Sequence, residues 1–134
     1  MSIKGRVVWD LSEFTAALRK VPEAVRTAAM VTLNHVGDRC EEAVRRNAPV
    51  DTGAMRDSTR KEGPFEEGDA LYVNIAVGGS QYTNPRTGGP VDYARHVEEG
   101  TARSRAQPFL LPGLLEGVRG IEPYFTRAFE RLMK

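Results

Sequence analysis

The chain has 134 residues, of which 19 are basic and 18 are acidic, so its formal net charge of +1 is close to zero. This length fits a single domain with one core and is too short for two large domains. The balanced charge speaks against a protein that tracks a phosphate backbone. No apolar run approaches the roughly 20 residues needed to span a bilayer. We therefore expect neither a membrane partner nor sequence-specific nucleic-acid binding.

The N-terminal sequence MSIKGRVVWD has no apolar signal region and no small-residue cleavage site, so we expect no secretion signal. The single cysteine, Cys40, cannot form an internal disulfide, which agrees with a reducing compartment. We expect a soluble protein that is made inside the cell.

The first part of the chain is predicted to contain a short strand and a long helix. Residues 5–9 read as a β-strand, after which the side chain of Asp10 or Ser12 can cap a helical turn. Pro22 suits the first turn of a longer helix, because its missing N–H does no harm there. From this point to Asn47, apolar residues recur every three or four positions, which describes one stripe on an α-helix. The stripe consists of Val25, Ala28, Ala29, Leu33, Val36, Cys40, Ala43 and Val44.

The middle of the chain is predicted to form a hairpin and a loop. Apolar residues occupy every second position from 71 to 77, as in a half-buried strand. The run 59–65 would pair with this strand through the turn EEGD. Residues 78–90 contain glycine at four positions and proline at two, so we expect a long exposed loop there. Residues 91–100 resume ordered structure as a short helix or strand.

The last third is predicted to be helical, because apolar residues keep nearly the same helical phase from Leu111 to Leu132. Gly117, Gly120 and Pro123 interrupt this phase, which leaves open either two segments or one kinked helix. Together the elements predict an α+β fold, with long N-terminal and C-terminal helices packed on a small antiparallel β-sheet. We expect one domain over residues 1–134.

Residues 51–54 read DTGA, a sequence in which aspartic proteases carry their catalytic aspartate. The chain is also short enough to be one half of such an enzyme, which would act as a dimer. Such an enzyme needs two carboxylates that share one proton. Its Asp-Thr-Gly normally follows a buried apolar strand, whereas VRRNAPV precedes it here. In a simpler interpretation, Asp51 caps a turn at the N–H of Gly53 or Ala54, Thr52 shares that role, and Gly53 takes a positive φ. We favour this corner and keep a homodimeric hydrolase using Asp51 as the alternative.

Other candidate chemistry is sparse. We expect His35, beside the apolar stripe, to be packed or half-exposed. His96 is close to Glu98 and Glu99, but two histidines without ligand spacing give a weak zinc signal, so solvated charge is the better interpretation. Cys40 occupies a stripe position, where a small buried thiol is the usual outcome. We therefore expect no catalytic residue, no metal and no cofactor.

Two segments, taken together, carry a family resemblance. APVDTGAMRDS at 48–58 is similar to the signature AP-x-DTG-x-L-R-x-S, and residues 93–114 are similar to Y-A-x-x-V-E-x-GT followed by QPFL-x-P-A. Both signatures belong to the siphophage tail-completion family, small proteins of the head–tail connector. The resemblance covers about residues 11–134. Met55 replaces the usual leucine, Gly113 replaces a common alanine, and the loop 80–90 looks longer than typical.

The resemblance implies a non-enzymatic structural subunit of a tailed phage or prophage, which completes or terminates the tail and assists head–tail joining. It implies a ring, commonly of six copies, with tail-tube or head-completion proteins as further partners. Its location would be the virion, and the host cytoplasm during assembly. A DNA-contacting connector module is a second alternative, since connectors surround passing DNA. The residues that match the signatures are Pro49, Asp51, Thr52, Gly53, Arg56, Tyr93, Glu98, Gly100, Thr101, Gln107, Pro108 and Phe109.

A ring needs two different patches on each subunit, so that the front of one copy meets the back of the next. The candidates for this assembly surface are Tyr82, Arg86, Arg103 and Arg105. The last two could pair with Glu66, Glu67 or Glu98 of a neighbour. We expect residues 108–110 to seat the last helix on the core.

Overall fold

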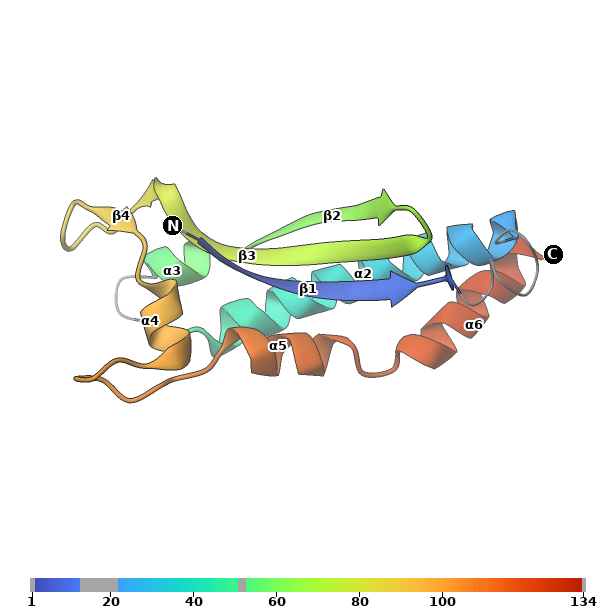
Figure 1. Ribbon diagram of the computed structural model, residues 1–134. Helices are drawn as coiled ribbons and strands as arrows, with labels where there is room; N and C mark the ends of the chain where they lie inside the picture. Colours follow the sequence, from blue (N-terminus) through green and yellow to red (C-terminus); the bar gives the residue numbers. More distant parts are fainter. Residues whose placement is uncertain (1, 13–21, 51–52, 134) are drawn as a thin grey trace.

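The computed structural model describes residues 2–12, 22–50 and 53–133, and it has two layers (Figure 1). One layer is an antiparallel sheet with the strand order β1–β3–β2, to which a short β4 adds by pairing with β3. The strands are β1 (Ser2–Asp10), β2 (Arg60–Glu67), β3 (Ala70–Thr83) and β4 (Pro90–Val91).

The second layer consists of helices on one face of the sheet (Figure 1). The helices within the described residues are α2 (Glu23–Asn47), α3 (Ala54–Asp57), α4 (Ala94–Glu99), α5 (Leu110–Gly117) and α6 (Ile121–Leu132). α3, α4 and β4 gather at one end, while α6 and the start of α2 lie at the other (Figure 1). The predicted α+β fold is confirmed. Among the described residues, no helix combines the length and apolar composition needed to cross a bilayer.

The predicted stripe on the long helix is the buried face of α2. Pro22 precedes this helix rather than entering its first turn, since its ψ of 142° is extended. Across the stripe lie the alternating residues of β3, all fully buried. The core residues from these two elements are Ala28, Ala29, Leu33, Val36, Cys40, Ala43, Val44, Leu71, Val73, Ile75 and Val77.

We expected an exposed loop over residues 78–90. This prediction was wrong for residues 78–83, which continue β3. Gly78 and Gly79 are buried, and Gly79 pairs with Val91 of β4. The connection itself is short, because Asn84 N–H donates to Gly89 O at 2.8 Å and closes it. The glycines thus permit an irregular strand, with a register shift between 79 and 83, instead of ending it.

The C-terminal helical region forms two segments, separated at Gly120, whose φ is 74°. At the start of the chain, β1 is longer than predicted, and the Asp10 carboxylate accepts a hydrogen bond from Ser12 N–H at 2.8 Å. This bond lowers the pKa of the Asp10 carboxyl.

Candidate functional site: the two signature segments

The first signature segment turns the chain from α2 towards β2. Helix α2 ends at Asn47, shortly before Pro49, because a proline disfavours helical geometry in the residue before it. Helix α3 begins after Gly53, whose φ of 85° is left-handed, as predicted. Asp51 and Thr52, the candidates for the cap and for the protease alternative, lie outside the described residues.

Ser58 joins this corner to the sheet. Its side chain is fully buried, and its Oγ donates to Met55 O at 2.7 Å and accepts from Gly78 N–H at 2.8 Å. The Arg60 guanidinium adds hydrogen bonds to Ser58 O and Gly78 O, both at 2.9 Å. Buried backbone groups need such partners. Ser58 therefore fixes the position of α3 against β3.

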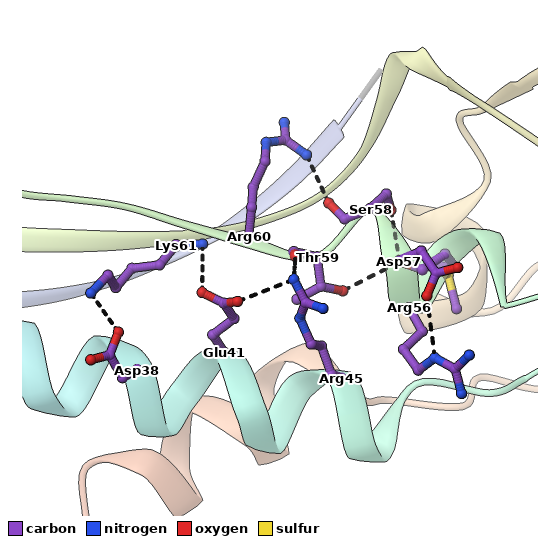
Figure 2. A network of polar contacts seen from close by, with 10 residues as sticks. Asp38, Glu41, Arg45, Arg56, Asp57, Ser58, Thr59, Arg60 and Lys61 are labelled. Carbon is purple, nitrogen blue, oxygen red and sulfur yellow. Dashed lines mark hydrogen bonds and ion pairs between the residues drawn. The ribbon is translucent and has the colours of Figure 1, made fainter.

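Figure 2 shows the polar contacts that hold β2 on α2. The Glu41 carboxylate accepts from Lys61 backbone N–H at 3.1 Å and pairs with Arg45 at 3.1 Å. The Arg45 guanidinium also donates to Thr59 O at 2.6 Å. The Lys61 ammonium pairs with Asp38 on α2. These contacts fix the strand that follows the corner.

Arg56 of the same segment is held much less. Its Nε lies 3.5 Å from the carboxylate of the adjacent Asp57, and both side chains are exposed. An exposed pair of this kind contributes little to stability. In the described part of the chain, the Arg56 guanidinium has no stronger contact and remains accessible to a partner.

In the second signature segment, Glu98 holds the start of α5. Its carboxylate accepts from the backbone N–H groups of Phe109 and Leu110 at 2.8 Å and of Leu111 at 3.1 Å. The first N–H groups of a helix have no intrahelical partner, and a carboxylate satisfies them well. Glu98 is thus engaged within its own subunit, and its pairing with an arginine of a neighbour stays a prediction.

Residues 101–108, which we call the arm, connect α4 to α5 and are all exposed (Figure 1). The base of the arm is tight, since Gly100 has a φ of 79° and an added Cβ would lie 2.7 Å from Ala106 N. Gln107 N–H donates to Val97 O at 2.8 Å, closing the base from the other side. The arm is therefore anchored at its base and solvated beyond it.

The outer part of the arm carries the two arginines predicted for assembly. Thr101 Oγ1 accepts from the backbone N–H groups of Arg103 at 3.2 Å and Ser104 at 3.1 Å, forming a local turn. Within the described ranges, no ion pair involves the side chain of Arg103 or Arg105. At the end of the arm, Pro108 is exposed and Phe109 is fully buried. Phe109 and Leu110, not Pro108, seat the last helical region on the core.

The two signature segments meet at a groove of about 310 Å³, which we call the signature groove. Asn84 belongs to the groove and donates to the Tyr93 hydroxyl at 3.4 Å. On its rim, Val50 is 61% exposed although it is apolar. The lining residues are Pro49, Val50, Gly53, Ala54, Met55, Asn84, Tyr93 and Val97. Sequence spacing offered no sign that 49–55 and 93–97 would share one cavity.

Tyr82 and Arg86 both belong to the β3–β4 hairpin, at the same end of the molecule as the arm (Figure 1). Tyr82 is half-buried, and the Arg60 guanidinium lies 5.2 Å from its ring centroid. Arg86 is exposed, and its backbone N–H donates to Asn84 Oδ1 at 2.9 Å. Tyr82 thus has a contact within its own subunit.

Cys40, His35 and His96, which we weighed as chemical groups from the sequence, do not line the signature groove. Burial raises the pKa of the Cys40 thiol to about 11, so the thiolate is scarce at neutral pH. His35 stacks on Tyr124 with centroids 4.0 Å apart, and His96 is exposed. No group of three or more metal-ligating side chains occurs within residues 2–12, 22–50 and 53–133.

Residues 12–100 match the family model described as "HK97-gp10-like: Bacteriophage HK97-gp10, putative tail-component". The chain belongs to this family. The match includes the first signature segment and the second as far as Gly100, but not the arm or the helices after it. Membership of a family of phage tail components indicates a structural role in a virion and interaction with other virion proteins. No curated protein and no solved structure matches the chain.

Proposed function

We propose that the protein is a non-enzymatic subunit of the head–tail junction of a tailed phage or prophage. In this proposal it completes or terminates the tail as an oligomeric ring, for which a hexamer is the first arrangement to test. The observation that carries the proposal is the gathering of both signature segments at one end of a subunit that belongs to a tail-component family.

A cyclic ring requires two different, complementary patches on each subunit. The signature groove, with exposed Val50 on its rim and accessible Arg56 beside it, is the first patch. The arm, with Arg103 and Arg105, is the second. Arginine is enriched at protein interfaces, and the buried centre of an interface is apolar. The head-side or tail-side partner would be another virion protein, met in the host cytoplasm during assembly.

Functional replacement tests this role. Phage extracts that lack the protein should yield separate heads and tails, and adding the purified chain should restore joined particles. The double variant Arg103→Ala/Arg105→Ala should lose this activity. Its free energy of unfolding should stay within about 0.5 kcal/mol of the parent's, because both side chains are exposed.

The matched control is Arg127→Ala/Arg131→Ala, which removes two exposed arginines from α6 and should restore joining normally. Electron microscopy of the tail ends would show whether a ring is present. Normal joining without the protein would contradict the proposed function, and full activity of the arm variant would contradict the arm as an assembly surface.

A further inference from the structure

The two edges of the sheet differ in how suited they are to pairing with another chain. On the β2 edge, the register against β3 shifts between Glu62 and Phe65, Gly63 has a φ of 104°, and Pro64 has no N–H. Bulges and prolines of this kind are how proteins prevent edge-to-edge pairing. β1, by contrast, keeps an unbroken register with β3 along Ser2–Asp10. Among the described residues, no strand pairs with the outer side of β1.

Two hollows border this open edge. One, of about 340 Å³, is lined by residues 2–4 together with side chains of α4, and the other, of about 510 Å³, by residues 7–9 together with side chains of α6. Successive residues of a strand point to opposite faces. Each hollow is lined by three successive residues of β1, so each runs along this strand; the first also includes Leu110 and the second Leu33.

Helix α5, which contacts β1, carries two exposed leucines. Gly113 and Gly117 face α2, and Leu114 packs on Gly5 of β1. Because each residue turns a helix by about 100°, Leu111 and Leu115 lie on the side of α5 that is turned away from α2. They are 57% and 58% exposed. The subunit alone thus leaves both leucines exposed on a helix that contacts β1.

We propose that two copies of the unassembled chain pair through β1, edge to edge and antiparallel about a two-fold axis. A second copy is the occupant because β1 is uninterrupted, unlike the β2 edge, and carries Lys4 and Asp10, whose opposite charges can pair between two antiparallel copies. Such a pair joins two sheets into one. It protects an edge that would otherwise invite aggregation until the subunit assembles.

Charge selects the register of this pair. Placing Arg6 opposite Arg6, or Lys4 opposite Arg6, brings like charges together, which is unfavourable across strands. Centring the axis on Val7 places Lys4 of each copy opposite Asp10 of the other and aligns residues 4–10. The alternative that places Arg6 opposite Asp10 aligns only residues 6–10, and Arg6 already donates to Asn74 at 2.8 Å. The register centred on Val7 is therefore preferred.

Charge exchange tests this register in the isolated full-length chain. Sedimentation equilibrium should show a reversible dimer, and Lys4→Asp or Asp10→Lys alone should each weaken it by about tenfold or more, since two like-charged pairs replace two opposite ones. The double variant Lys4→Asp/Asp10→Lys should restore the parent dissociation constant. Within one subunit the double variant still has a carboxylate at position 4 beside Glu62, the present partner of Lys4, so a local effect could not produce this rescue.

Glu67→Lys makes the same charge change as Asp10→Lys on the opposite, interrupted edge and should leave the dimer unchanged. A chain that stays monomeric at concentrations of about 100 μM, or that dimerises without sensitivity to these changes, would overturn the proposal. So would a double variant that fails to recover. None of these outcomes bears on the ring, because joining activity is measured separately.

Discussion

In the seam between α2 and α5, Gly113 and Gly117 lie against the backbone of Val44 and Cys40, whereas every residue of the arm, 101–108, is exposed. The seam leaves no room for a single added carbon. The arm buries little of its own surface, although its base is held in a defined turn. Ordering a segment costs conformational entropy that burial normally offsets. The fold of one subunit therefore explains the seam, whereas for the arm we propose that a partner contacts it.

The seam predicts the largest loss of stability. In Gly117→Ala the new Cβ would lie 2.8 Å from both Cys40 Cα and Cys40 N, and backbone atoms cannot move aside as a side chain can. We expect a loss of about 2–3 kcal/mol in the free energy of unfolding, measured by urea denaturation. Gly89→Ala is the control, since the nearest atom to its Cβ is Thr87 Oγ1 at 3.6 Å. Equal stability of the two variants would contradict close packing at the seam.

The junction of the corner with the sheet comes next. Ser58→Ala removes the hydroxyl that accepts from Gly78 N–H and donates to Met55 O, leaving two buried backbone groups without that partner. We expect a loss of about 1–3 kcal/mol. Ser80→Ala, at an exposed position of β3, should change the melting temperature very little. If Ser58→Ala behaves like Ser80→Ala, the corner does not depend on this hydroxyl.

The helix cap should give the smallest of the three losses. Glu98→Ala deprives the first N–H groups of α5 of their carboxylate, and we expect a loss of about 1–2 kcal/mol. The control is Glu99→Ala, which removes an exposed carboxylate that pairs with Arg95. Thermal melts compare the two. An equal or larger effect at Glu99 would contradict the capping role of Glu98.

The sequence alone predicted the helices and strands whose apolar residues recur at a regular spacing. The stripe of α2 and the alternation of β3 indicate their buried faces directly, because both faces meet in one core. The left-handed Gly53 also followed from local sequence, since a turn after Pro49 requires a residue that tolerates a positive φ.

The features that the local sequence could not predict depend on contacts between residues far apart in the chain. Glu98 looked like one of several exposed acids, and its role depends on α5 beginning beside it. Ser58 meets Gly78 only after β3 pairs with β2. Gly78 and Gly79 looked like breakers because glycine adds nothing to a periodic apolar signal, yet Gly78 pairs with Ser2 of β1 and Gly79 with Val91 of β4. The signature groove likewise exists only in the folded chain.

Hydrogen–deuterium exchange tests most directly whether the arm is explained by a partner. Amides of the arm and of the α2–α5 seam would be compared between the isolated chain and the chain assembled into tails. We predict that the arm exchanges fast in the isolated chain and becomes protected after assembly, while the seam is protected equally in both. Arm amides that exchange as fast in assembled tails as in the isolated chain would contradict the account.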